Sequence, residues 1–299
     1  MPVREEKKDK LKEITDKLEQ GVKEVFESDR YREYLTCMTK FHNYSTGNTI
    51  LICMQYPQAT LVAGYKAWQQ KHGRSVRRGE KGIQIIAPYK FKVKTDELDE
   101  NGKEKEVERT GFRVAYVWDI SQTEGRELPT LGVDELTGDV DGYKKLFAAL
   151  DRNSPVPVYV SEISGTAKGY YDDAAGKIVI REGMSQLQTI KTLVHEMSHA
   201  KLHARDVEGS ENIDRRTKEC EAESIAFVVC DHFGLDTSDY TFSYVAGWSS
   251  GKDVPELKAS LDRIRETADE IIRSVDKDLK KEYSMERSDD ARDGKVAER

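Results

Sequence analysis

Residues 193–203 read LVHEMSHAKLH, and this stretch decides the fold of the second half of the chain. It places His195 and His199 four residues apart within a segment whose apolar residues recur at helical spacing. Side chains at positions i and i+4 lie on one face of a helix, so both imidazole rings can reach one ion. Glu196 stands beside the first histidine, where its carboxylate can take a proton from a metal-activated water. The pattern therefore predicts a zinc-dependent peptidase centre with two histidine ligands and Glu196 as the catalytic residue.

A catalytic zinc usually has three protein ligands and one position open for water. The next helical pattern, KECEAESIAFVVC at 218–230, places Glu219 and Glu223 on one face beside small alanines. We expect Glu219 to be the third ligand and Glu223 to accept a hydrogen bond from a ligand histidine, although the two roles could be exchanged. Glu221 points to a different face. His203 lies about 12 Å along the helix from the first histidine, which favours a helix-end or supporting role.

The sequence leaves the peptide or protein substrate unidentified. The strand-like segment KIVIR at 177–181 precedes the metal-binding helix and could receive an extended substrate by edge pairing. Peptide hydrolysis also needs a hydrogen-bond donor for the developing oxyanion. Four tyrosines are candidates for that donor: Tyr170, Tyr171, Tyr240 and Tyr244.

Residues 31–94 carry eleven Lys and Arg against two Glu, a net charge of +9 in a chain whose net charge is −7. A basic segment inside an acidic protein indicates a polyanion-binding surface. Single-stranded nucleic-acid binders combine such a surface with aromatic stacking platforms. The candidate contacts to single-stranded DNA are Tyr44, Ser45, Asn48, Gln55, Tyr65, Trp68, Arg74, Arg77, Arg78 and Lys81. Each aromatic taken alone is more often a core residue, whereas the arginine-rich turn at 74–82 is harder to explain by packing.

The pattern of apolar residues predicts an α+β fold in two domains. In the first, strand-like segments at 83–94 and 107–118 flank the turn dipeptide Asn101-Gly102, which predicts a β-hairpin. The second is expected to be mainly helical and zincin-like, with a small sheet. The predicted divisions are a DNA-binding domain at 1–125, a linker at 126–140, a metallopeptidase domain at 141–275 and a disordered, highly charged tail at 276–299.

The composition also predicts the cellular compartment in which the protein is found. The chain has no run of about 18 apolar residues that could span a membrane, and its N-terminus has no apolar signal-peptide core. Its four cysteines are too few and too scattered for a disulfide framework. We therefore expect a cytoplasmic protein with reduced thiols and no membrane partner.

The stretch FHNYSTGNTILICMQYPQATLVAGYKAWQQKHGRSVRRGEKGIQIIAPY, residues 41–89, resembles the N-terminal single-stranded-DNA-binding domain of ArdC-like antirestriction proteins. Two later stretches, TLVHEMSHAKLH at 192–203 and ECEAESIAFVVCDHFGLD at 219–236, resemble the zincin metallopeptidase domain that accompanies it. They are similar, more loosely, to the ImmA/IrrE peptidases. Together these resemblances cover most of residues 5–275.

The resemblance implies that His195, His199 and Glu219 hold zinc and that Glu196 is catalytic. It also implies a protein of conjugative plasmids or other mobile elements that binds incoming single-stranded DNA and protects it from restriction. Two alternatives remain open: an ImmA-like peptidase that cleaves a repressor, and a DNA-binding protein whose zincin domain is catalytically silent. The intact Glu196 argues against a silent domain.

Overall fold

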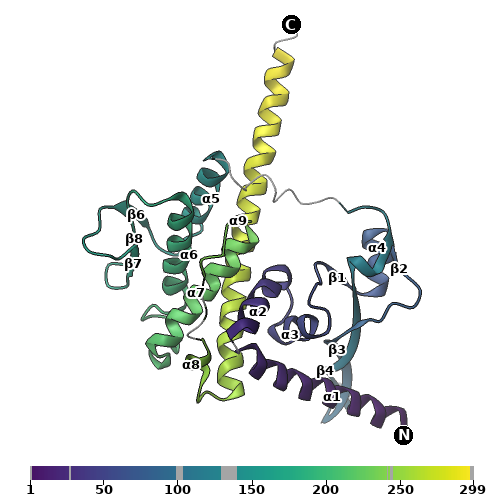
Figure 1. The fold of residues 1–299 in the computed structure, drawn as a ribbon. Coiled ribbons are helices and arrows are strands. Elements are labelled where there is room, and N and C mark those ends of the chain that lie inside the picture. The colour runs from purple at the N-terminus through teal and green to yellow at the C-terminus, as the bar shows by residue number, and fades with distance from the viewer. Residues whose placement is uncertain are drawn as a thin grey trace. The chain divides into compact units, whose positions relative to one another are not determined.

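The computed structural model describes residues 2–26, 28–98, 104–128, 140–240, 242 and 245–296 (Figure 1). The chain divides into two compact units. The first comprises Met1–Val25 and Thr46–Leu128, and the second comprises Phe26–Ser45 and Pro129–Arg299. The α+β class is confirmed. The division differs from the predicted domain at 1–125, because residues 26–45 cluster with the C-terminal unit. Most of the predicted linker, residues 129–139, lies outside the described residues.

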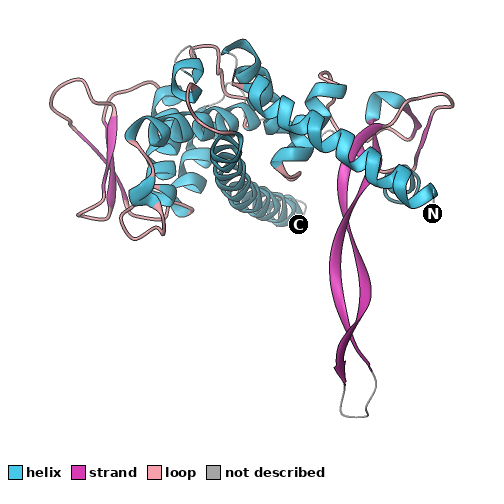
Figure 2. Cartoon of the chain, turned by 90° about the horizontal axis from the view of Figure 1, so that it is seen from below, coloured by secondary structure: helices cyan, strands magenta, loops and turns pink. Residues whose placement is uncertain are grey.

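A long β-hairpin dominates the first unit. Strands β3 (Ile83–Leu98) and β4 (Glu104–Asp119) pair antiparallel in a twisted ribbon (Figure 2). The predicted turn at Asn101-Gly102 lies outside the described residues. The short strand β1 (Val62–Ala63) pairs antiparallel with β4, which gives the strand order β1-β4-β3.

Helices cover the base of this hairpin. Helix α1 (Pro2–Val25) and helix α3 (Thr46–Gln55) pack on each other and on the two long strands. The core of the unit consists of fully or almost fully buried apolar side chains: Ile14, Val22, Ile50, Leu51, Ile52, Trp68, Ile83, Ile85 and Val117. Because only the proximal ends of β3 and β4 contribute to this core, their distal halves form an arm with two solvent-exposed faces.

The rest of the first unit is a small cap. Helix α4 (Tyr65–His72) ends at Gly73, whose φ of 63° is the left-handed conformation that glycine adopts without strain. Strand β2 (Arg74–Val76) then pairs antiparallel with β5 (Thr123–Gly125), after the short 3₁₀ helix η1 (Ile120–Gln122).

The second unit is mainly helical. It contains α2 (Ser28–Phe41), α5 (Val140–Arg152), α6 (Gln186–Leu202), η3 (Ser210–Asn212), α7 (Arg215–His232), α8 (Val245–Ser249) and α9 (Val254–Val296). Helix α7 lies between α6 and α9 and packs on both (Figure 1). Apolar side chains on all three helices are buried in one core, including Leu193, Val194, Met197, Ile225, Val229, Leu261, Ile264 and Ile271.

A three-stranded sheet flanks α6. Strand β8 (Lys177–Arg181) lies in the centre, parallel to β6 (Val158–Ser161) and antiparallel to β7 (Gly169–Asp172). The prediction that an extended substrate pairs with 177–181 is therefore wrong, since both edges of β8 already have strand partners. The strands with one unpaired edge in this sheet are β6 and β7.

The expected disorder of 276–299 is also corrected. Helix α9 continues through this segment to Val296, and Val275 and Leu279 extend its buried stripe. Arg152 at the end of α5 donates to the Asp278 carboxylate at 3.1 Å. Apolar anchors and an ion pair from α5 thus hold the start of this segment, up to Leu279, although its composition alone indicates disorder. Residues 297–299 lie outside the described residues.

Two cysteines also depart from expectation. Cys37 and Cys53 are each disulfide-bonded, so the expectation of reduced thiols is wrong for these two residues. Cys220 and Cys230 are free and buried in the second unit. Among the helices that the structure describes, none has the length and apolar character required to cross a membrane.

Candidate metal centre and nucleic-acid interface

Helix α6 positions the two histidines of the predicted metal centre. The helix begins after Ser185, whose hydroxyl accepts the backbone N–H of Gln188 as an N-cap. On the opposite side of the helix, the side chains of Leu193, Val194 and Met197 are fully buried in the core. His195 and His199 therefore face outward together, toward α7.

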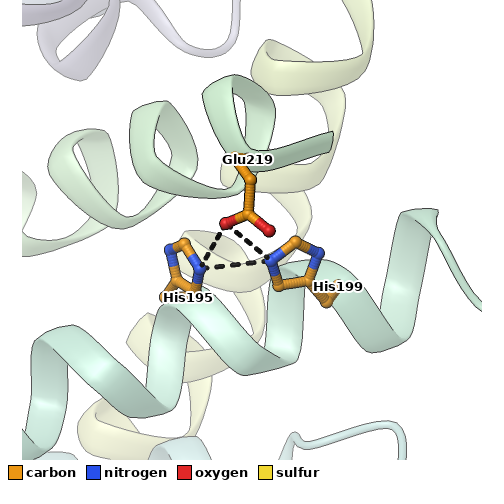
Figure 3. Close-up of side chains that lie close together, drawn as sticks. All are labelled: His195, His199 and Glu219. Atoms are coloured by element: carbon orange, nitrogen blue, oxygen red, sulfur yellow. Dashed lines mark hydrogen bonds and ion pairs between the residues drawn. The ribbon is translucent and has the colours of Figure 1, made fainter. Parts of the chain in front are cut away.

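Glu219 on α7 completes a three-donor cluster (Figure 3). The Nε2 atoms of His195 and His199 lie 3.1 Å apart. The Oε2 atom of Glu219 lies 3.5 Å from the first nitrogen and 3.7 Å from the second. Ligands held by a tetrahedral zinc at about 2.1 Å are about 3.4 Å from one another. Two imidazole nitrogens and one carboxylate oxygen at these separations fit a single ion of this kind.

Each histidine has a partner on its other ring nitrogen. The Nδ1 atom of His195 lies 3.3 Å from Oε2 of Glu223. A carboxylate can only accept, so Nδ1 carries the proton and Nε2 presents its lone pair to the cluster. The predicted roles of Glu219 and Glu223 stay predictions; in the structure Glu219 lies near Nε2 of His195 and Glu223 near its Nδ1.

His199 is oriented through a longer chain. Its Nδ1 atom lies 2.9 Å from Nδ1 of His203, whose Nε2 lies 3.1 Å from Oε2 of Glu221. Glu221 is fully buried and also accepts hydrogen bonds from Ser260 and Arg263 of α9. Since Glu221 accepts from His203 Nε2–H, the Nδ1 of His203 accepts from His199. The Nε2 lone pair of His199 is then directed at the cluster.

The charges of the cluster shift its pKa values. Burial alone would lower the pKa of His195, but Glu219 and Glu223 outweigh it and raise the pKa to about 9. Hydrogen bonds from His195 and His199 hold the pKa of Glu219 far below its ordinary value. Burial lowers the pKa of His203 and outweighs the opposing effect of Glu221, which keeps the His203 ring neutral.

Glu196 lies on the same helix, in a different environment. Its side chain is buried, and burial raises its pKa against the opposing effects of His195 and His199. It lines a cavity of about 450 Å³ together with His195, Glu223, Gly169 and Tyr240. A carboxyl group with a raised pKa beside a candidate metal-ligand cluster is suited to exchange a proton.

The cavity also limits the choice of oxyanion donor. Tyr240 lines it, whereas the hydroxyl of Tyr171 donates to Asp173 at 3.0 Å. Tyr170 is 42% exposed on β7 and does not line the cavity. Tyr244 lies outside the described residues. Of the described candidates, Tyr240 alone lies at the cavity.

Several predicted DNA contacts have structural roles instead. Trp68 is fully buried, and its Nε1–H donates to the Trp118 carbonyl at 2.9 Å, so the prediction that its ring stacks on bases is wrong. Asn48 exchanges two hydrogen bonds with the Ile86 backbone, at 3.0 and 2.9 Å. Gln55 does the same with the Gln84 backbone, at 2.8 and 2.9 Å. Both amides hold α3 against β3 and complete the hydrogen bonding of that strand.

In the arginine-rich turn, too, some of the predicted DNA contacts have structural roles and others are exposed. Arg74 donates to Thr123 and to the carbonyl of Gly125, and so ties β2 to β5. Arg77 pairs with Glu80 at 2.7 Å and donates to backbone carbonyls. These two side chains stabilise the cap. Arg78, Lys81 and Tyr65 are exposed and stay candidates for DNA contact. Tyr44 and Ser45 belong to the second unit, so the predicted contacts are divided between the two units.

Comparison with known proteins agrees with this architecture. Residues 4–118 match the family described as the N-terminal domain of anti-restriction factor ArdC. The chain also aligns with the metal-free crystal structure of the antirestriction protein ArdC from the R388 plasmid, at 20% identity and a TM-score of 0.50. That alignment covers 78% of this chain and 86% of the other. Over residues 4–118 the chain is ArdC-like. At this identity, the structural likeness shows a shared fold.

Two further proteins are similar to the chain. The Mn(II)-bound crystal structure of R388 ArdC aligns at 20% identity and a TM-score of 0.46, over 78% of this chain and 85% of the other. An uncharacterised protein of Bacillus anthracis is 29% identical over 315 residues, which cover 92% of this chain and 53% of the relative. The chain therefore spans about half the length of that relative.

Two features of this chain escaped the sequence reasoning. The bond between His203 and Glu221 was not predicted, because the arginine that holds Glu221 lies 42 residues away. The exposed aromatics of the β3–β4 arm, Tyr89 and Phe91, are not among the predicted DNA contacts. The alternation Tyr89-Lys90-Phe91-Lys92 was the signal that could have placed them on one face of a strand.

Proposed function

We propose that the second unit is a metal-dependent peptidase with zinc as its ion. The observation that supports this most directly is the cluster of His195, His199 and Glu219. Its first histidine lines one cavity together with the buried Glu196. His195, His199 and Glu219 would hold the ion. When bound, a zinc ion supplies Lewis acidity that polarises a peptide carbonyl and lowers the pKa of water.

The chain's own residues supply the remaining parts of the reaction. Glu196 accepts the proton of the attacking water and delivers it to the leaving amine, as its raised pKa permits. Tyr240 lines the same cavity and is our candidate donor to the oxyanion that develops on the substrate carbonyl, a role in which its hydroxyl would exchange its hydrogen bond to Cys230 for one to substrate. Strand β7 is an edge strand of its sheet and packs on α6, so its outer edge could pair with an extended peptide.

The test combines metal analysis with a cleavage assay. Wild type, His195→Ala and Glu196→Gln would be loaded with zinc or manganese and measured by mass spectrometry of the metal and by cleavage of a random peptide library. We expect Glu196→Gln to keep the metal and lose cleavage, and His195→Ala to lose both. Full metal content in His195→Ala would refute the site, and unchanged cleavage in Glu196→Gln would refute the role of Glu196.

We further propose that the first unit binds single-stranded DNA, as an antirestriction protein that protects incoming strands would. The match of residues 4–118 to the ArdC N-terminal domain and the exposed Arg78, Lys81 and Tyr65 support this assignment. Fluorescence anisotropy with labelled single strands and duplexes, across a salt series, tests it. Single-strand-selective binding that weakens steeply with salt is expected. Absence of binding by the full-length chain would refute it.

A further inference from the structure

The distal half of the β3–β4 arm has two chemically different faces. Side chains alternate between the faces along each strand, and the antiparallel register fixes which residues share one. One face, here called the arginine–aromatic face, carries Tyr89, Phe91, Arg109, Gly111 and Arg113. The other, here called the lysine–glutamate face, carries Lys90, Lys92, Glu106, Glu108 and Phe112. The two faces belong to the same ribbon (Figure 2).

The arginine–aromatic face presents two neighbouring rings. Tyr89 and Phe91 are each 40% exposed, with ring centroids 5.6 Å apart and planes inclined by 32°. Gly111 lies opposite Tyr89 in the register, where an added Cβ would stand 2.9 Å from the Tyr89 ring. The absent side chain therefore gives the Tyr89 ring room to lie across β4. The Arg113 guanidinium lies 5.8 Å from the centroid of the same ring.

Charge distinguishes this face from the other. On the lysine–glutamate face, Lys90 pairs with Glu108 at 2.6 Å and Lys92 pairs with Glu106 at 3.1 Å. Among the described side chains, neither Arg109 nor Arg113 forms an ion pair. On the arginine–aromatic face, residues 87–93 and 107–113 include no Asp or Glu. One face is neutralised internally. The other keeps two positive charges beside two exposed rings.

We propose that the arginine–aromatic face binds single-stranded nucleic acid, with bases stacking on Tyr89 and Phe91 and phosphates contacting Arg109 and Arg113. Cationic side chains without an ion pair favour an anionic ligand, and exposed aromatic rings favour a ligand with flat apolar surfaces. Single-stranded nucleic acid has both, in its phosphates and its unstacked bases. A duplex keeps its bases stacked on each other and offers the rings no free face. The inference rests on the proposed DNA binding of the first unit and extends it to a surface outside the cap.

The experiment measures binding of the full-length chain to a labelled mixed-sequence 20-mer, single-stranded or duplex, by anisotropy across a salt series. Tyr89→Ala combined with Phe91→Ala should weaken single-strand binding by at least about 25-fold, because each of the two lost stacks costs about 5-fold or more. Arg109→Gln combined with Arg113→Gln should lower the slope of log affinity against log salt by about 1.4.

The other face supplies matched controls. Lys90→Gln combined with Lys92→Gln removes the same charge from the same arm, and Phe112→Ala removes a ring that is 58% exposed. Both controls should bind like wild type. If wild type binds but the variants of the two faces are equally affected, the arm inference is overturned while DNA binding stands. If wild type binds no single strand, both are overturned, and preference for the duplex overturns the assignment of a single-stranded ligand.

Discussion

The Nε2 atom of His203 lies 3.1 Å from Oε2 of Glu221, and both side chains are almost completely buried. This pair connects His199 of the candidate metal cluster on α6 to Arg263 and Ser260 on α9. A ligand histidine whose second nitrogen is fixed presents one tautomer and one ring orientation. The preorganisation of the centre thus depends on a helix that contributes no ligand.

We predict that Glu221→Gln weakens metal affinity by about 10- to 100-fold, the usual effect of losing a partner of a ligand histidine. Competition titration with a chromophoric chelator measures it. Ser260→Ala, which removes a donor to Glu221 on the side away from His203, should have a smaller effect. Urea unfolding of the metal-free variants measures their folding stability, so that a loss of metal affinity can be distinguished from a loss of stability. Unchanged metal affinity in Glu221→Gln would contradict the orienting role.

A second prediction concerns the part of α9 around Leu279, where the predicted disordered tail begins. Leu279 is 4% exposed, and Leu279→Ala should lower the free energy of unfolding by about 2–5 kcal/mol through lost burial and a residual cavity. Urea denaturation followed by circular dichroism measures this change. Lys280→Ala, at the next and exposed position, is the control and should change little. Equal, small effects at both positions would favour the disordered tail expected from composition.

A third prediction concerns acid stability of the first unit. The buried Asp119 carboxylate accepts hydrogen bonds from the N–H groups of Thr60, Leu61 and Ser121, at 2.7, 3.0 and 2.9 Å. Burial alone would raise the pKa of Asp119, but the hydrogen bonds from Ser121, Thr60 and Leu61 outweigh it and lower the pKa. This stabilisation is therefore complete above the unfolded value of about 3.9 and is lost as the pH falls through the lower folded value.

Asp119→Asn should accordingly cost about 1–3 kcal/mol at pH 7 and make unfolding less dependent on pH below about 4. Urea unfolding at pH 7, 4 and 3 tests both parts. The exposed Asp16 on α1 provides the control variant Asp16→Asn. A steeper acid dependence in Asp119→Asn than in wild type would show that the sign of the pKa shift is wrong.

A fourth prediction separates two adjacent arginines. Arg77→Ala breaks the bonds to Glu80 and to backbone carbonyls, so it should lower the melting temperature with little loss of DNA affinity. Arg78→Ala combined with Lys81→Ala should leave the melting temperature unchanged and weaken single-strand binding. Differential scanning fluorimetry measures the melting temperature, and fluorescence anisotropy measures the binding of single strands. A loss of affinity in Arg77→Ala as large as in the other variant would refute this division.

Local patterns in the sequence already determined the metal-binding helix, the hairpin and the end of α4. Two histidines at i and i+4 face one side of any helix, and alternation along 83–94 places residues on two sides of any strand. A glycine after a periodic segment ends a helix by its own conformational freedom. These features depend on neighbours within one or two turns of chain, so they could be predicted without knowing the packing.

Packing between distant segments decided the rest. Glu219 faces the histidines and Glu221 is buried against Arg263 because of how α7 lies between α6 and α9. Trp68 is buried because the first unit closes over it, although its sequence context suits an exposed platform equally well. The middle of α9 is held at Asp278 by Arg152 of α5, more than a hundred residues earlier. The sequence by itself determined which groups were available for chemistry. Only the tertiary structure decided which of them are exposed, because burial and hydrogen bonding depend on partners far away in the chain.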